Sequence, residues 1–401
     1  MSVPPVLVAF RPHDPAATYR LVERTGDAPL SIELTIRSEH DDPRPFLTLL
    51  IAAKDRWQDF RLHIEAREFS QWCLNVLRSI NDMPALSNVL YLPRLTSLEV
   101  RLPVHTGYNL PPDQLNYYGA PVQCLFFRDW STPALRQLEI GNNYPVQIRD
   151  ALDIEACYLS FNTRLVQTWG LLPLAQFLSS SCCRRLTHLV LDFEQTEFAI
   201  TESLPSIYLR NLYSLEVRLT DCDTPLRFLT IFSRLRTPVL QKLKLLVSLD
   251  MLVAQAQDEG VTDWIEALLA APNNFRALRK LRLQIQSPGA RAVAPLRTVF
   301  ERCPNLHNLT ISGNLHPPPV NALPGRVPPL RKLKLLDCWN FDLPFVQYMS
   351  ARLKLNPRAW EEFRLIRIQD CPYLQESEVK KLFPAHTVEV LETLDEMHES
   401  D

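Results

Sequence analysis

The stretch Pro93-Arg94-Leu95-Thr96-Ser97-Leu98-Glu99-Val100 decides the fold, because the phrase it contains returns along the chain. The pattern Pro-x-Leu-x-x-Leu-x-(Val/Ile/Leu) begins again at Pro133, Pro238, Pro304 and Pro328. A phrase that recurs in this way marks one supersecondary unit, which can bury its apolar face only against its neighbours. The sequence therefore predicts an array of stacked units.

A looser frame, apolar-x-x-apolar-x-apolar, extends the repeat over most of the chain. It also starts at Trp57, Val122, Leu186, Leu212, Leu278 and Phe363. Five intervals between starts fall within the roughly 20–29 residues of leucine-rich repeats. The longest interval, from Leu135 to Leu186, predicts a degenerate unit that begins at Ile154. The shortest interval, from Val122 to Leu135, is too short for a full repeat, which makes the start at Val122 doubtful.

The residue that follows each predicted strand supports the same repeat. Three positions past the third apolar residue stand Asn143, Asn314, Cys338 and Cys371, the residue types of the pattern L-x-x-L-x-L-x-x-(N/C). We expect these side chains to be buried and to bond backbone groups that the turn leaves unpaired. The predicted fold class is α/β: an irregular leucine-rich-repeat solenoid (horseshoe) with parallel strands on the concave face and helices outside.

Three regions follow from this pattern. Residues 1–66 are predicted to be an N-terminal capping region or first degenerate turns, with an alternating strand over 30–36 and another over 56–64. Residues 67–384 form the predicted solenoid, with proline-rich insertions at 103–121 and 313–329 and helices that begin near Trp264 and Phe345. Residues 385–401 are an acidic C-terminal tail or capping helix, because Val388, Leu391, Leu394 and Met397 recur every three residues.

Composition describes an ordinary globular chain with no strong charge. It has 401 residues, 46% apolar and 22% charged, with a formal net charge of −2. Any attraction to nucleic acid or membrane must then come from a local patch. No apolar run is long enough for a membrane span or a secretory signal, so we expect an intracellular protein, cytoplasmic or nuclear.

No sequence pattern indicates catalysis. The chain has no glycine-rich phosphate loop, no nucleophile elbow and no zinc-protease motif, so the prediction is a non-enzyme with no catalytic residue, cofactor or metal. The nine cysteines are scattered, and the adjacent pair Cys182 and Cys183 lacks the spacing of a zinc or redox site. We expect buried free thiols.

The residues between the leucines predict a polarised binding face. In each strand, positions three, five and seven of the frame point away from the core. Before about residue 240 they include Glu99, Arg101, Glu139, Asp192, Glu216 and Arg218, and after it they include the predicted partner-binding residues Lys242, Lys244, Lys280, Arg282, Lys332, Lys334 and Arg367. Like charges on neighbouring strands cost a few tenths of a kcal/mol each, which favours an acidic partner. The alternative is a merely solvated row whose long side chains splay apart or pair with carboxylates at the rim.

The acidic tail could compete for the same face. Beyond residue 385 the chain carries Glu389, Glu392, Asp395, Glu396, Glu399 and Asp401, with no Lys or Arg. These six acids could fold back over the basic row and displace a partner.

Two N-terminal stretches carry a family resemblance. Residues 19–34, which begin Tyr19-Arg20-Leu21-Val22, and residues 54–62 around Trp57 resemble the region just after the F-box in fungal (basidiomycete-type) F-box/leucine-rich-repeat proteins. Nothing before Tyr19 resembles the helix opening of an F-box. In that family the F-box binds a Skp-type adaptor of a cullin ubiquitin ligase, and the repeats select the substrate.

The resemblance implies a protein-interaction module like the substrate receptor of a ubiquitin ligase, with a cullin-ligase adaptor as partner only if an F-box is present elsewhere. The alternative is a free-standing leucine-rich-repeat scaffold or regulator that binds an acidic protein. Nucleic acid is a weaker third possibility, because the basic outward positions carry no aromatic residue to stack on bases.

Overall fold

The computed structural model of the chain describes residues 4–10, 15–66, 71–83, 90–103, 127, 130–142, 148–162, 168–199, 204–222, 231–232, 234–248, 269, 275–286 and 293–391. The chain divides into two compact units, Met1–Leu212 and Tyr213–Asp401. The predicted start at Val122, the insertion at 104–121 and the helix from Trp264 lie outside the described residues.

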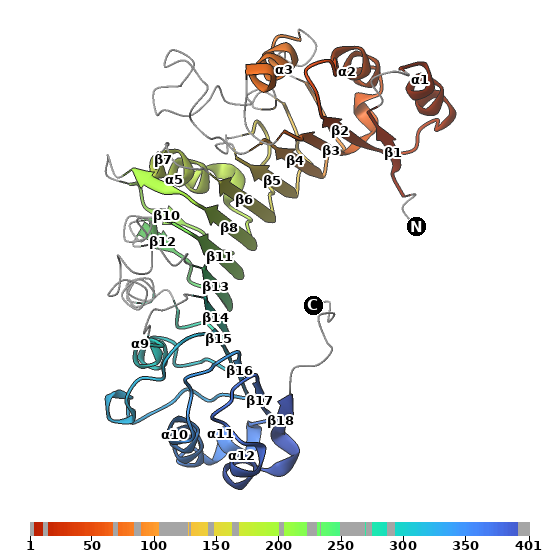
Figure 1. Ribbon diagram of the computed structural model, residues 1–401. Helices are drawn as coiled ribbons and strands as arrows, with labels where there is room; N and C mark the ends of the chain where they lie inside the picture. Colours follow the sequence, from red (N-terminus) through yellow and green to blue (C-terminus); the bar gives the residue numbers. More distant parts are fainter. Residues whose placement is uncertain are drawn as a thin grey trace. The chain divides into compact units, whose positions relative to one another are not determined.

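The first unit is a parallel sheet with helices on one side (Figure 1). Its strands are β1 (Val6–Ala9), β2 (Leu30–Ile36), β3 (Trp57–Ile64), β4 (Ser97–Arg101), β5 (Gln137–Gly141), β6 (Ala156–Asn162) and β8 (His188–Glu194), in that order across the sheet. Its helices are α1 (Pro15–Arg24), α2 (Arg44–Ile51), α3 (Gln71–Asn81) and α5 (Leu171–Ser179), with short turns η1 (Lys54–Arg56) and η3 (Ser181–Cys183). The short strands β7 (Thr168–Gly170) and β9 (Glu197–Ala199) pair with each other, and β10 (Ile207–Tyr208) ends the unit.

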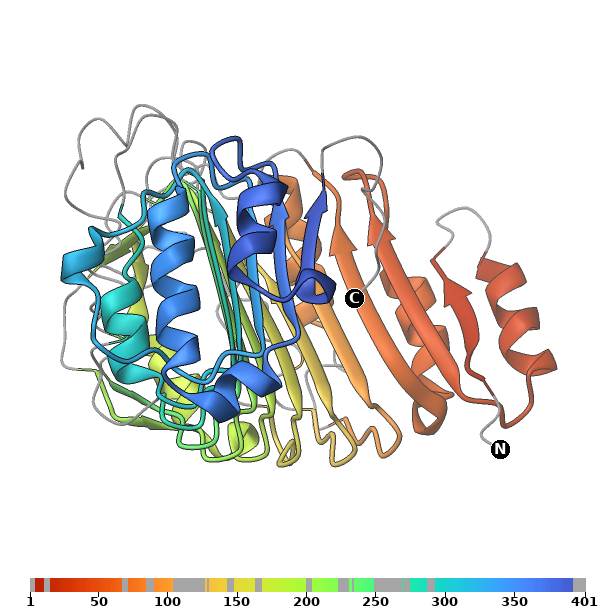
Figure 2. The same cartoon turned by 90° about the horizontal axis from the view of Figure 1, so that it is seen from below.

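The second unit repeats this arrangement. Its strands are β11 (Ser214–Thr220), β13 (Lys242–Ser248), β14 (Lys280–Gln286), β15 (Asn308–Gly313), β16 (Lys332–Leu336), β17 (Leu365–Gln369) and β18 (Val388–Leu391), again parallel and in sequence order. Its other elements are β12 (Leu235–Arg236), α9 (Leu296–Arg302), α10 (Leu343–Lys354), α11 (Pro357–Glu362), α12 (Glu376–Leu382), η4 (Val320–Ala322) and η5 (Ala385–Thr387). Strand after strand points the same way within each unit (Figure 2).

The leucine phrase builds these sheets as its spacing predicts. Leu98 and Val100 of β4 are fully buried, whereas Glu99 between them faces away from the core. Parallel strands must be joined by crossovers, and helices lie in several of them, such as α2 between β2 and β3 and α10 between β16 and β17. The predicted unit at Ile154 is confirmed, since its apolar residues are buried and β6 pairs with β5 on one side and β8 on the other.

A recurrent turn ends several strands. The residue just past the strand is left-handed at Asn142 (φ 54°), Gln195 (φ 47°), Asp221 (φ 50°), Asp337 (φ 54°) and Asp370 (φ 53°). Such a backbone costs an ordinary residue about 1–2 kcal/mol, and short polar side chains like Asn and Asp adopt it most readily. We call these five the exit residues.

The side chain after the exit residue ties one strand to the strand before it. Thr196 Oγ1 donates to the carbonyl of Phe161 at 3.1 Å, and Cys338 Sγ donates to the carbonyl of Ile311 at 3.3 Å. Cys371 Sγ repeats the contact with Leu335 at 3.6 Å. The prediction of buried Cys338 and Cys371 in this turn is confirmed.

Asn314 does not follow this pattern. It is exposed, and Leu315 is fully buried in its place. The reason is Gly313, whose φ of 104° turns the chain at the end of β15 so that the next apolar residue enters the core. Asn143 lies outside the described residues.

The C-terminal segment also differs from the predicted helix. Residues 385–387 form the η5 turn and 388–391 form β18, which pairs with β17. The β-branched residues Val388 and Val390 alternate with Glu389, and this period of two fits an added edge strand better than a helix. Residues 392–401 are outside the described part of the chain.

The described cysteines agree with the expectation from their spacing. Eight of the nine, all except Cys124, are described as buried free thiols. Burial raises the pKa of the Cys303 thiol to about 12, which keeps it protonated and unreactive at neutral pH. Among the helices in the described ranges, none is long and apolar enough to cross a membrane.

We expect Gly313→Ala to destabilise the second unit strongly. A Cβ at residue 313 would lie 1.8 Å from the carbonyl oxygen of Ile285, and the φ of +104° is unfavourable for any L side chain. The free energy of unfolding should fall by at least about 2 kcal/mol, as measured by urea denaturation followed by circular dichroism.

Gly325→Ala is the matched control for this substitution. A Cβ there meets nothing within 4 Å, so the change should stay within about 0.5 kcal/mol. Equal effects of the two substitutions would contradict the role assigned to Gly313.

Candidate protein-binding face

We call the side of each sheet opposite its helices the open face (Figure 1). The side chains that alternate with the buried apolar residues along each strand point to this face. In the second unit the strand register places one residue of each strand in a single central row. The row runs Glu216, Lys244, Arg282, Thr310, Lys334, Arg367 and Glu389. Beside it runs a parallel row of Ser214, Lys242, Lys280, Asn308, Lys332 and Leu365. All seven predicted partner-binding residues therefore lie on one face of one unit.

Carboxylates stand at both ends of the central row. Lys244 Nζ lies 3.1 Å from Glu216 Oε1, and Arg218 Nε lies 2.6 Å from the same oxygen. Burial raises the pKa of Glu216, but the hydrogen bonds from Arg218 and Lys244 outweigh it, so the pKa is lowered overall. At the other end Arg367 Nε bonds Glu389 Oε2 at 2.9 Å. The outermost cations of the row are thus paired.

The sequence prediction missed Glu389 in this row. A tail or capping helix over residues 385–401 would place Glu389 among the acids that could fold back, whereas it lies within the sheet opposite Arg367. The alternation Val388-Glu389-Val390 carried the signal for a strand. The basic face is therefore shorter than predicted, and its centre lies on β14, β15 and β16.

The centre of the face is less compensated than its ends. Within the described ranges, no carboxylate oxygen lies within 4.0 Å of the Lys280 or Lys332 ammonium nitrogen, and both residues are exposed. Lys242 Nζ lies 5.1 Å from the centre of the Tyr213 ring, a cation–π contact. A hollow of about 660 Å³ lies over these strands, lined by Lys242, Lys244, Lys280, Arg282, Asn308, Thr310, Lys332, Lys334 and their neighbours.

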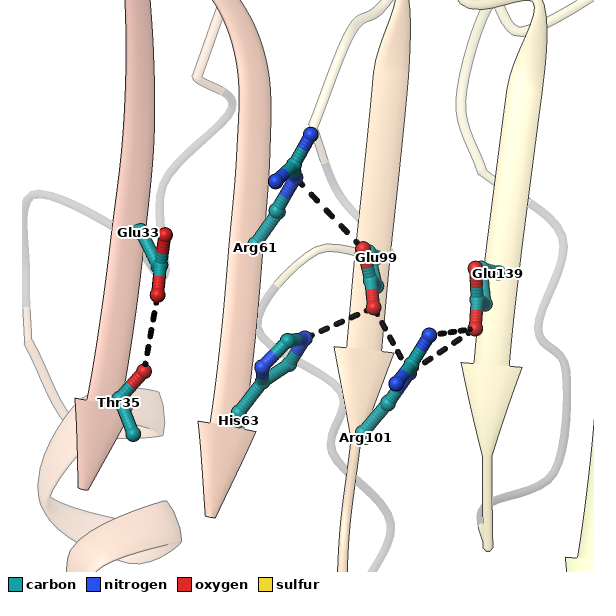
Figure 3. A network of polar contacts seen from close by, with 7 residues as sticks. All are labelled: Glu33, Thr35, Arg61, His63, Glu99, Arg101 and Glu139. Carbon is teal, nitrogen blue, oxygen red and sulfur yellow. Dashed lines mark hydrogen bonds and ion pairs between the residues drawn. The ribbon is translucent and has the colours of Figure 1, made fainter. Parts of the chain in front are cut away.

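The open face of the first unit has the opposite character, because its charges are joined in a network (Figure 3). Glu99 is only 14% exposed, and its Oε1 lies 2.8 Å from His63 Nε2 and 2.7 Å from Arg101 Nε. Arg101 also bonds Glu139 Oε1 at 2.6 Å, and Arg61 approaches Glu99 Oε2 at 3.7 Å. This network holds its own counter-charges and offers little net charge to a partner.

Sequence reasoning found Glu99, Arg101 and Glu139 on this face but overlooked Arg61 and His63. Both lie on β3, beside β4, in register with Glu99 and Arg101. The frame that starts at Trp57 already gives their positions as five and seven, so extending the row to that frame would have placed them. The hydrogen bond from His63 lowers the pKa of the Glu99 carboxyl, and the positive charges of Arg101 and Arg61 lower it further. Burial acts in the opposite direction, but these effects outweigh it.

In the part of the chain that the structure describes, no group of three or more His, Cys, Asp or Glu side chains could hold a metal ion.

The chain matches no protein-family model and no curated protein. Its function must therefore be inferred from the charges, distances and exposure of its own residues.

Glu99→Gln should make the stability of the protein less sensitive to acid. A carboxyl whose pKa is lowered in the folded state stabilises that state above its ordinary pKa of 4.5, and the stabilisation is lost as pH falls through the lowered value. We expect the variant to lose about 1–3 kcal/mol of unfolding free energy at neutral pH and to converge with the wild type only once the pH has fallen below the lowered pKa of Glu99. Urea denaturation at a series of pH values measures both.

Glu65→Gln is the control for this substitution, because Glu65 bonds Arg37 at 3.0 Å in an exposed pair. Exposed pairs contribute between 0 and about 1 kcal/mol, so this variant should resemble the wild type at every pH. If Glu99→Gln shows the same acid sensitivity as the wild type, the network does not stabilise the first unit.

Proposed function

We propose that the chain is a leucine-rich-repeat protein that binds an acidic protein partner through the open face of its second unit and catalyses no reaction. The observation that carries this proposal is the pair of exposed ammonium groups of Lys280 and Lys332 at the centre of a basic hollow. A row of like charges is unfavourable by itself, and an acidic ligand would remove that cost.

The leucine-rich-repeat assignment is supported by the strand, exit residue and buried Cys or Thr that recur in both units. Together with the resemblance of residues 19–34 and 54–62 to fungal F-box/leucine-rich-repeat proteins, it favours a role like the substrate-recognition part of a cullin ubiquitin ligase. A free-standing scaffold that binds one acidic protein is the second candidate, and the hollow suits both equally.

Reversing the two central charges should abolish most of the binding. Lys280→Glu with Lys332→Glu removes two attractions and adds two repulsions, each on the order of 1 kcal/mol near a protein surface. The affinity of the full chain for a labelled polyglutamate peptide should fall at least about tenfold by fluorescence anisotropy. Wild-type binding should also weaken as salt is raised.

Arg302→Glu with Arg326→Glu is the charge-matched control, because both residues are exposed and neither lines the hollow. Its affinity should stay close to that of the wild type. If the central variant keeps its affinity, or if wild-type binding is insensitive to salt, the binding site lies elsewhere.

Glu389→Gln should have the reverse effect. It releases Arg367 from the ion pair at 2.9 Å, so the affinity for polyglutamate should rise, by up to about fivefold given the energies of exposed pairs. Unchanged affinity would show that Glu389 does not compete for the face. A point substitution tests this better than removal of residues 385–401, which would delete the edge strand β18.

Affinity purification with the wild type and the Lys280→Glu, Lys332→Glu variant discriminates among the candidate roles. Peptides of a cullin and its adaptor support the ubiquitin-ligase role, and a single acidic protein supports the scaffold. Material that disappears after nuclease treatment would contradict both and favour nucleic acid. Partners that depend on the face should be recovered with the wild type and lost with the variant.

A further inference from the structure

A second hollow of the second unit, of about 760 Å³, lies where the last strands leave the sheet. Its lining includes Trp339 after β16, residues 370–372 after β17, and Val390 and Leu391 at the end of β18. We call it the rim hollow. Among the described residues, none lines both the rim hollow and the basic hollow of the open face.

Large apolar side chains lie exposed around the rim hollow. Trp339 is 59% exposed and Leu391 is 43% exposed, and both line it. Tyr373, which follows the lining residue Pro372, is 66% exposed. Apolar side chains that gather on a surface beside polar ones are typical of interaction sites. The rim hollow therefore suits a ligand with apolar groups.

The strand beside the rim hollow forms the edge of the sheet. β18 is the last strand in the strand order and pairs with β17 (Figure 1). On its other side, no strand among the described residues pairs with it. An edge of this kind presents backbone N–H and C=O groups that can pair with another chain.

The turns after β16 and β17 bring two carboxyl groups together. Asp337 and Asp370 are the exit residues of these strands, and the N–H of Asp337 donates to the carbonyl of Gln369 at 2.9 Å, which joins the turns. Burial raises the pKa of the Asp337 carboxyl, and the charge of Asp370 and a hydrogen bond with it raise this pKa further. A positive charge placed beside such a pair would relieve the repulsion.

The lining of the rim hollow favours a cation with an apolar stem. The charged residues in the described lining are Asp370 and Glu376, and Glu376 Oε1 is already balanced by Lys380 Nζ at 2.5 Å. Trp339 lines the same hollow, and an indole ring is the best aromatic partner for the cation of a lysine or an arginine. These two residue types combine an apolar stem with a charged tip.

We propose that the rim hollow and the edge of β18 bind an extended segment of a second protein that carries a lysine or an arginine between apolar residues. The segment adds a strand beside β18, and its cationic side chain lies against Trp339 and Asp370. In this mode backbone hydrogen bonds supply affinity, and pockets for alternate side chains supply specificity. Because the open face prefers the opposite charge, one chain could hold an acidic partner and a basic partner at the same time.

Charge also distinguishes this occupant from two others. A twofold contact between copies of the chain would set Asp370 and Glu376 against the same acids of the second copy. Residues 392–401 follow β18 directly, but they carry five acids and no Lys or Arg. Both would bring negative charge to an acidic hollow, whereas a basic segment brings the complementary charge.

The test uses labelled peptides of alternating serine and valine that differ at one central residue: lysine, norleucine or glutamate. Norleucine keeps the aliphatic stem of lysine but has no charge. Binding to the full chain is measured by fluorescence anisotropy at constant ionic strength. The lysine peptide should bind about tenfold more tightly than the norleucine peptide, and the glutamate peptide should bind most weakly.

Two substitutions test the assigned side chains. Asp370→Asn removes the charge but suits the left-handed backbone at this position, and Trp339→Leu keeps an apolar side chain but removes the ring. Each should reduce the preference for lysine over norleucine to about threefold or less. Asp221→Asn is the matched control, because Asp221 is also a left-handed exit residue and does not line the rim hollow. Thermal unfolding of each variant checks that it is folded.

Methylation of the peptide backbone tests the added strand. Two forms of the lysine peptide are N-methylated, one at the odd and one at the even residues, so that each loses the N–H groups on one side of the strand. One form should bind at least about tenfold more weakly than the unmodified peptide. If both bind as tightly as the unmodified peptide, the segment does not pair with β18.

The remaining outcomes separate this site from the open face. The Lys280→Glu, Lys332→Glu variant should bind the lysine peptide within about threefold of the wild type, whatever its affinity for polyglutamate. Loss of lysine-peptide binding in that variant, equal wild-type affinity for the lysine and norleucine peptides, or no binding of either would overturn the assignment. A dimer in sedimentation that Trp339→Leu abolishes would assign the rim hollow to a second copy instead.

Discussion

The structure depends on how each parallel strand leaves its sheet. A parallel strand must hand the chain to a crossover, and at that point backbone groups lose their partners in the ladder. Left-handed exit residues turn the chain there, and the next side chain, Thr196, Cys338 or Cys371, donates to a carbonyl of the preceding strand. Each turn is thereby fixed to its neighbour, and so is the register of the strands.

The fixed register determines what the open face can do. Because side chains alternate strictly along a strand, a constant register turns single positions of the repeat into continuous rows. The equivalent position of the repeat holds Glu99 and Glu139 in the first unit and Lys244, Arg282 and Lys334 in the second. The two units therefore share a backbone pattern and differ in the charge that the row presents.

The parts of the structure that depend on local periodicity could be predicted from the sequence. The leucine frame gave the strands and the outward rows, because burial of every second side chain leaves a direct trace in the residue types. It could not give the ion pairs of Glu216 with Lys244 and of His63 with Glu99, which join residues far apart in sequence. The threefold spacing of apolar residues after Val388 suggested a helix, but pairing with β17 favours the strand, as tertiary contacts often override local preference.

The contrast between the two open faces bears on which one is available to a partner. In the first unit Glu99 is 14% exposed and bonded to His63 and Arg101, so a ligand would have to break those bonds before it gained any. In the second unit, residues 308 and 310 lie between the cations of β14 and β16. Acidic residues at these two positions would neutralise those cations. β15 instead places an amide and a hydroxyl there, which donate hydrogen bonds but carry no charge. Neutral donors on β15 leave the positive potential of the cations on β14 and β16 intact. This arrangement makes the face suited to an incoming anion.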